Sequence, residues 1–161
     1  MNKWLKWVIG ILLIFTVSGC FAEDYDVGLP SARLEVGEMD GLLAYPLTEA
    51  NISWSSSSGE VKNVVLDIEE FGPNQNKIFA HPNQEARIDI IENEENSGSS
   101  GASWPDSIAV TLWKNGEDTD LDVNEDGEFT FPNTEGTFVM EVITRNSSNK
   151  AQYVGYVEIK K

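Results

Sequence analysis

Apolar and polar residues alternate along much of the chain. The alternation runs through residues 64–69, 88–90, 108–112, 129–131, 138–142 and 153–159. A period of two directs one set of side chains toward a core and the other toward solvent, as in a β-strand with one buried face. These stretches therefore predict short strands, whereas no long helical period appears in the sequence.

Turn-forming residues separate the alternating stretches. The clearest segments are FGPNQN (71–76), NSGSSGAS (96–103), KNGE (114–117), NEDGE (124–128) and RNSSNK (145–150). Asn-Gly and Asp-Gly pairs favour type I′ hairpin turns, because both central residues of that turn need a positive φ. Several short strands at this spacing indicate an all-β sandwich or barrel, and we favour the sandwich.

The chain begins with a different pattern. Lys3 and Lys6 precede an apolar stretch at residues 8–17, which is short for a membrane span and typical of a secretory signal peptide. Residues 17–20 (VSGC) resemble the lipobox of bacterial lipoproteins, in which a peptidase cleaves before a cysteine that carries a diacylglycerol thioether. The resemblance predicts covalent diacylglycerol on Cys20. The alternatives are a signal peptide with an incidental cysteine and an uncleaved spanning helix.

Lipidation of Cys20 would place the protein at the extracytoplasmic face of a bacterial cell membrane, since two acyl chains anchor stably. We expect three regions: the lipoprotein signal peptide (1–19), the lipidated cysteine with a flexible acidic tether (20–32), and a β-sandwich domain (33–161). Because Cys20 is the only cysteine, the folded domain is expected to contain no disulfide bond.

The charge of the chain narrows the classes of partner. The sequence has 11 basic and 27 acidic residues, and residues 1–19 contain two of the lysines and no acid. The mature chain would therefore keep nine basic residues and carry a net charge of −18. Such a surface cannot neutralise phosphates, which argues against nucleic-acid binding. It favours solubility and cationic partners.

The C-terminal half carries a set of strand motifs. From WPDSIAVTLWKNGE (104–117) through residues 127–161 the chain resembles a group of uncharacterised surface lipoproteins of Gram-positive bacteria. The matching residues are Pro105, Ser107, Ile108, Val110, Trp113, Phe129, Pro132, Gly136, Val142, Tyr153 and Val157. Residues 50–70 also resemble the tryptophan-bearing strand of that group.

One of these strands has a wider resemblance. The segment EGTFVMEV (135–142) is similar to the strand of immunoglobulin-like sandwiches that carries the tyrosine corner, although Phe138 lacks the hydroxyl of that corner. The resemblances together imply an immunoglobulin-like β-sandwich on a cell surface. They transfer no catalytic or ligand-binding residues.

Oxygen-bearing residues recur at alternate positions before Gly127. These residues are Asp120, Asp122, Asn124 and Asp126, and they resemble the first half of a calcium-binding loop. Carboxylate and amide oxygens that converge in this way suit a hard cation. The twelfth position, counted from Asp122, is Asn133 instead of a bidentate glutamate. The alternative, which we favour, is an acidic hairpin turn with solvated carboxylates.

Residues for catalysis are few. His81 is the only histidine, no GxSxG motif is present, and the acidic run at 92–95 is interpreted as a solvated strand end or loop. We therefore expect no enzyme. Among the aromatic residues, Trp104 is a candidate for stacking on a sugar or anchoring a partner protein, whereas Trp54 and Trp113 are expected to pack in the sandwich.

Three functional hypotheses follow from the sequence. The leading one is a lipid-anchored, non-catalytic β-sandwich that binds an envelope protein or polysaccharide. The second is a calcium-binding module that uses residues 120–126. The third, an envelope hydrolase, would need a cleft with convergent carboxylates or a base beside a nucleophile.

Overall fold

The computed structural model describes residues 28–161 except 39–40, 57–58, 66, 92–104 and 147–148. Its strands are β1 (Ser31–Glu38), β2 (Gly41–Pro46), β3 (Thr48–Ser56), β4 (Gly59–Asn63), β5 (Lys77–Ala80), β6 (Glu85–Ile91), β7 (Ser107–Lys114), β8 (Glu117–Leu121), β9 (Glu128–Thr130), β10 (Gly136–Asn146) and β11 (Asn149–Ile159). A short helix α2 (Ile68–Phe71) and a 3-10 turn η1 (Gly72–Asn74) lie between β4 and β5. The predicted all-β class is confirmed.

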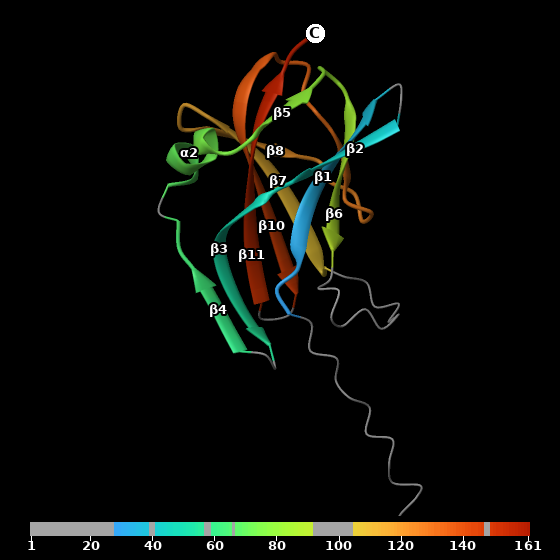
Figure 1. The fold of residues 1–161 in the computed structure, drawn as a ribbon. Coiled ribbons are helices and arrows are strands. Elements are labelled where there is room, and N and C mark those ends of the chain that lie inside the picture. The colour runs from blue at the N-terminus through green and yellow to red at the C-terminus, as the bar shows by residue number, and fades with distance from the viewer. Residues whose placement is uncertain (1–27, 39–40, 57–58, 66, 92–104, 147–148) are drawn as a thin grey trace, which may run out of the picture.

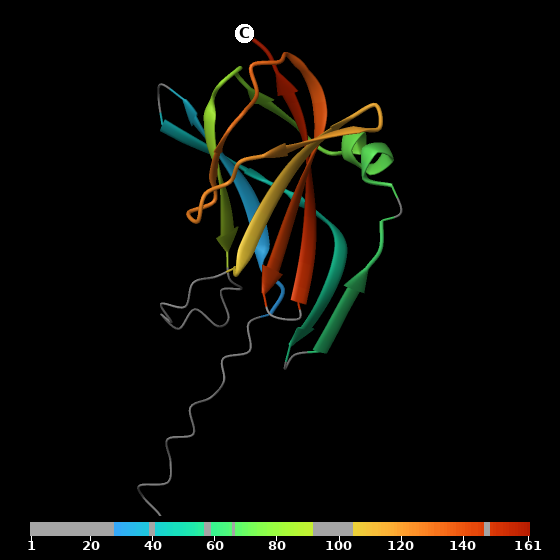
Figure 2. The same ribbon diagram turned by 180° about the vertical axis from the view of Figure 1, so that it is seen from behind.

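The strands form two sheets that pack face to face, as Figures 1 and 2 show from opposite sides. The four-stranded sheet has the order β2-β1-β6-β9. The seven-stranded sheet has the order β4-β3-β11-β10-β7-β8, and β5 lies beside β11. Neighbouring strands are antiparallel except β5 and β11, which are parallel. The predicted sandwich is therefore also confirmed.

The strand order from β6 onward matches that of an immunoglobulin-like sandwich. In that fold strands B and E share one sheet, and strands C, F and G share the other. Here β6 pairs with β9, whereas β7, β10 and β11 are neighbours in the second sheet and β8 flanks β7. Strands β6, β7, β9, β10 and β11 thus take the places of B, C, E, F and G. Strands β2, β3 and β4 extend the two sheets beyond this arrangement.

The core between the sheets consists of one set of the alternating side chains. On β10, the inward residues are Phe138, Met140 and Val142, as the period of two predicts. Trp54 of β3 is also in this core, and only 1% of it is exposed, so its predicted packing is confirmed. Full burial of such a large apolar side chain stabilises the fold by about 1.5–3 kcal/mol.

A second, smaller apolar cluster covers the outer face of the seven-stranded sheet. Ala50, Val139 and Val154 are its buried members, and side chains of α2 pack against them. Trp113 also packs here, so the expectation that it lies within the sandwich is wrong. The reason is the alternation itself: Leu112 faces the core, which turns the next residue to the opposite face.

The described residues of the segment 64–69, which exclude residue 66, do not form the expected strand. Strand β4 ends before this segment, Val64 is 73% exposed, and a helix follows. The Asp67 carboxylate accepts hydrogen bonds from the backbone N–H groups of Glu69 (2.9 Å) and Glu70 (3.2 Å). This is an N-cap, which favours a helix over an extended strand at the residues that follow it.

A buried hydrogen bond fixes the point at which the chain enters the sandwich. The Tyr153 hydroxyl, on the inward face of β11, donates to the backbone carbonyl of Pro30 at 2.6 Å. Strand β1 begins at Ser31 and Ala32 is buried, so the folded domain starts slightly before the expected boundary at residue 33. Burial raises the pKa of Tyr153 well above its usual value near 10, and the Glu49 carboxylate adds to this effect.

We predict that Tyr153→Phe lowers the free energy of unfolding by about 1–3 kcal/mol, because the buried carbonyl of Pro30 loses its donor. The raised pKa gives a second expectation. Above pH 10 the tyrosine ionises more readily in the unfolded chain than in the folded one, so stability falls as the pH rises. This alkaline loss should be smaller in Tyr153→Phe.

Denaturant unfolding between pH 7 and pH 11 measures both effects. The matched control is Tyr156→Phe, since Tyr156 lies on the same strand but is only half-buried. Its change should stay within about 0.5 kcal/mol at pH 7. Equal stability of wild type and Tyr153→Phe across this range would contradict the role of the buried hydroxyl.

Candidate functional site

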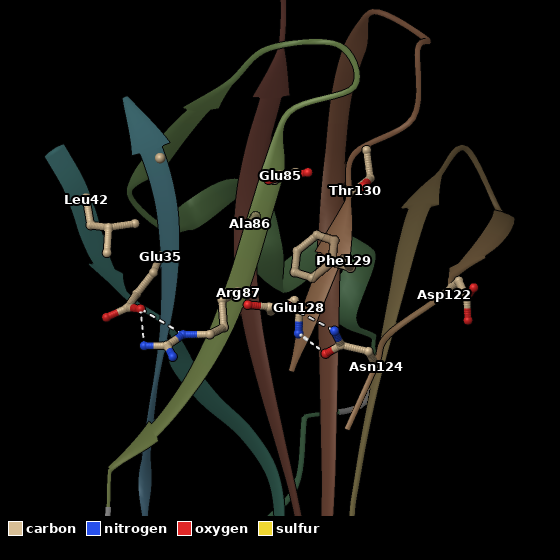
Figure 3. A pocket seen from close by; sticks show the side chains of 11 residues that line it. Glu35, Leu42, Glu85, Ala86, Arg87, Asp122, Asn124, Glu128, Phe129 and Thr130 are labelled. Atoms are coloured by element: carbon tan, nitrogen blue, oxygen red, sulfur yellow. Dashed lines mark hydrogen bonds and ion pairs between the residues drawn. The ribbon is translucent and has the colours of Figure 1, made fainter. Parts of the chain in front are cut away.

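A groove crosses the outer face of the four-stranded sheet (Figure 3). It has a volume of about 820 Å³, and its lining residues include Glu35, Leu42, Arg87, Asp122, Asn124 and Glu128. Outward positions of β1, β6 and β9 form its floor, while the segment between β8 and β9 forms one side. A site on strands is held rigidly, because each side chain is fixed by the register of the sheet.

Two cross-strand ion pairs lie on this outer face. Glu35 and Arg87 are directly opposite each other on β1 and β6, and the guanidinium donates to one carboxylate oxygen at 2.7 and 3.0 Å. Arg33 and Asp89 are the next opposite pair on this face, at 2.7 Å. The hydrogen bond and charge of Glu35 raise the pKa of Arg87. Pairs of this kind favour the observed register over a slipped one.

Other carboxylates in the groove are not balanced in this way. Glu85, Asp122 and Glu128 have no salt-bridge partner among the residues that the structure describes. Arg87 is the single basic residue that lines the groove, and Glu35 already engages it. The groove therefore carries net negative charge, and a cationic group placed in it would be attracted.

The four residues of the predicted calcium loop are divided between the groove, strand β8 and the turn before β9. Asp122 and Asn124 line the groove, whereas Asp120 lies on β8 of the other sheet and accepts a hydrogen bond from the Thr111 hydroxyl at 2.7 Å. Asp126 is exposed in the turn before β9. No group of three or more His, Cys, Asp or Glu side chains suited to a metal ion is found in the described part of the chain.

Asn124 has a structural role in this turn. Its Oδ1 accepts hydrogen bonds from the backbone N–H groups of Asp126 (3.0 Å) and Glu128 (2.8 Å). Its Nδ2 donates to the Glu128 carboxylate at 2.9 Å (Figure 3). An amide oxygen that accepts two backbone N–H groups is a poor candidate for a metal ligand. The arrangement is an Asx-type turn that orders the edge of the groove.

Gly127 allows this turn to pack against the sheet. Its φ is +78°, and a Cβ there would lie 2.7 Å from the backbone carbonyl oxygen of Ile88. The Gly127 carbonyl in turn accepts a hydrogen bond from the Ile88 N–H at 2.9 Å.

The two predicted hairpin turns have different outcomes. The NEDGE turn (124–128) joins β8 of one sheet to β9 of the other, so its prediction as a hairpin is wrong. The KNGE turn, with positive φ at Asn115 and Gly116, is the predicted hairpin between β7 and β8.

The remaining sequence candidates are not brought into the groove. The exposed His81 ring hydrogen-bonds through Nδ1 to the Lys160 carbonyl at 2.9 Å, which ties the β5–β6 turn to the C-terminus. Cys20, Trp104 and the acidic run at 92–95 lie outside the described residues. Their predicted roles in lipidation, binding and hydrolysis remain predictions.

A row of hydrogen-bonded side chains lies on the outer face of the seven-stranded sheet, with Glu141 and Gln152 buried and Asn51 and Trp113 half-buried. Asn51 donates to Gln152, Gln152 donates to Glu141, and the Trp113 indole N–H donates to the other Glu141 oxygen at 2.7 Å. The alternation of the sequence did not predict this row, because a period of two assigns residues to a face of the sheet and does not indicate hydrogen bonds between their side chains. A β-bulge helps to form it, since the register of β3 and β11 shifts opposite Gln152. Each group has a partner, so the row is structural.

The chain matches no model of a known protein family, and no curated protein matches it. None of the helical segments in the described residues has the length and apolar character that a membrane span requires. The function must therefore be inferred from the residues of the chain.

We predict that Asn124→Ala lowers the free energy of unfolding by about 1–2 kcal/mol, because two backbone N–H groups lose their acceptor. The loss should be the same in millimolar calcium and in a chelator. Thermal unfolding of wild type and Asn124→Ala in the two buffers measures this. Asp126→Ala is the control, with an expected change within about 0.5 kcal/mol, since its side chain is exposed. A wild-type melting temperature that rises with calcium, and does not rise in Asn124→Ala, would instead support a calcium site.

Proposed function

We propose that this protein is an extracytoplasmic lipoprotein, anchored by diacylglycerol on Cys20, whose β-sandwich is a non-catalytic binding module. The groove across β1, β6 and β9 is its binding surface, and its ligand is a cationic segment of an envelope component. The observation that carries the proposal is the imbalance of charge in the groove, where one arginine faces several carboxylates.

The sequence supports the anchor. A short apolar stretch after two lysines ends in VSGC, and no other cysteine occurs in the chain. Strong net negative charge keeps the mature domain soluble and repels anionic head groups, so attachment would depend on the acyl chains. The Tyr153–Pro30 hydrogen bond ties the end of the expected tether to a central strand of the sandwich, as an anchored domain requires.

The shape and charge of the groove support a role in binding. It is an open groove on a sheet face, and the Glu35–Arg87 pair lies on the side nearest Leu42 (Figure 3). Neither a serine, a cysteine nor a histidine is among its lining residues, so those residues supply no nucleophile–histidine pair. A polar, concave surface with a fixed array of charges can still select a partner by electrostatic complementarity.

We predict that Cys20→Ala abolishes membrane attachment, since the acyl chains would have no sulfur to join. Fractionation of cells that express the full chain measures the distribution, and intact mass spectrometry of the native protein identifies the modification. Ser18→Ala is the control, because it keeps a small residue before the cysteine and should leave attachment unchanged. An unmodified Cys20 with residues 1–19 still present would contradict the anchor.

We also predict that full-length protein in detergent binds hexalysine and does not bind hexaglutamate. The double variant Glu85→Gln/Glu128→Gln should weaken hexalysine binding by about two- to tenfold, as expected for the loss of exposed charge pairs. The control, Glu117→Gln/Asp118→Asn, removes the same charge from exposed positions of β8. Titration calorimetry at two salt concentrations measures the affinities. Equal weakening by both double variants would mean that binding depends only on net charge, and the groove would not be the site.

A further inference from the structure

One free sheet edge in the described part of the chain differs from the others in charge. The edge strands β4, β5, β8 and β9 each contain at least one charged residue, and β5 and β9 are also very short. Charges and short length are the usual protection against pairing with another strand. Strand β2, with the sequence GLLAYP, has six residues and no charge.

The side chains of β2 are also unusually exposed for an apolar strand. Leu42 is 69% exposed and lies opposite Gly37 of β1, which has no side chain to cover it. Leu43 is 42% exposed and lies on the same face as Val36, at the rim of the core. Both leucines would lose apolar contact with water if another strand were added to this edge.

The register of β2 against β1 determines which backbone N–H and C=O groups of β2 point to the free edge. The Leu47 N–H donates to the Ala32 carbonyl at 2.9 Å, and in an antiparallel ladder every second residue makes such a bond. The paired positions on β2 are therefore Leu43 and Tyr45, which bond to β1. The N–H and C=O groups of Leu42 and Ala44 then point to the free edge, where an added strand would meet them.

We propose that β2 is a homodimerisation edge, where the β2 strands of two copies pair antiparallel about a two-fold axis. Leu42 of each copy would exchange two backbone hydrogen bonds with Ala44 of the other, and Leu43 would face its own symmetry mate. The two four-stranded sheets would join into one continuous sheet. A contact about a two-fold axis uses the same surface patch of both subunits, and an antiparallel pair of two β2 strands meets this requirement.

The charge of the chain restricts which of its sheet edges can meet a second copy. Two mature chains would each carry a net charge of −18, so they repel unless their contact surface is neutral. On β8 a two-fold contact would set Glu117, Asp118 and Asp120 against like charges. Strand β2 places no carboxylate of its own in the contact. The interface is small, so we expect a weak dimer that confinement on a membrane would favour.

A single cysteine tests this geometry. Facing residues of a non-hydrogen-bonded antiparallel pair have Cα atoms about 4.5 Å apart, which is within the range that a disulfide bridges. Leu43→Cys in the full chain, oxidised on its native membrane, should therefore form a disulfide-linked dimer. Val61→Cys is the matched control, because Val61 is 43% exposed on the edge strand β4 but has charged neighbours. Wild type, with Cys20 alone, reports background cross-linking.

A measurement without a new cysteine complements the cross-link. Sedimentation of wild-type protein in detergent should show more dimer at 500 mM salt than at 50 mM, since salt screens repulsion between the two acidic chains. Leu43→Lys should remain monomeric at both concentrations. The proposal fails if Leu43→Cys yields no more dimer than Val61→Cys, if it cross-links to another protein instead, or if salt dissociates the dimer. None of these outcomes bears on the anchor or on hexalysine binding.

Discussion

The central hairpin of β10 and β11 is buried on both of its faces, and much of the structure follows from this constraint. Its inward side chains, such as Met140 and Tyr153, form the core with the four-stranded sheet. Its outward apolar side chains, Val139 and Val154, must also be covered, and α2 covers them. Polar groups on the same outer face cannot reach water freely. The row from Asn51 to Trp113 satisfies them with one another, so that both oxygens of the buried Glu141 carboxylate have a donor.

Alternation was a good guide to the C-terminal strands, but the predicted stretches did not include β1, although Ala32, Leu34 and Val36 of that strand alternate and are buried. It located β6, β7, β9, β10 and β11, because their inward residues are large and apolar. It failed at residues 64–69, where the cap at Asp67 favours a helix, a local contact that the period of two does not register. It also gave no signal for β2, whose side chains are nearly all exposed, or for β8, which is mostly acidic. Strands that bury little leave little pattern in the sequence.

The candidate site was only partly visible in the sequence. The spacing of Asp122 and Asn124 drew attention to a segment that contributes to the groove, because both residues line it. The chemistry inferred from that spacing differs from the observed arrangement, in which the Asn124 oxygen holds backbone N–H groups. Glu35 and Arg87 are 52 residues apart, and only the register of β1 against β6 brings them together. A sheet face assembled from distant strands cannot be read from one local segment.

The position of the chain entry relates the anchor to the two proposed surfaces. Strand β1 begins at the end of the sandwich opposite the C-terminus, as both ribbon views show (Figures 1 and 2). If Cys20 is lipidated, this end faces the membrane and the C-terminal end points away from it. The ten residues from Cys20 to Leu29 could span at most about 35 Å when extended, so the domain would stay close to the bilayer. At that range an acidic domain would be held near an anionic surface that repels it, and the Tyr153–Pro30 bond would add to the pairing with β2 and β6 that holds the first strand in the sheet. The groove and the β2 edge both lie on the four-stranded sheet that this strand helps to form, so the same contact that secures the tether also supports both surfaces.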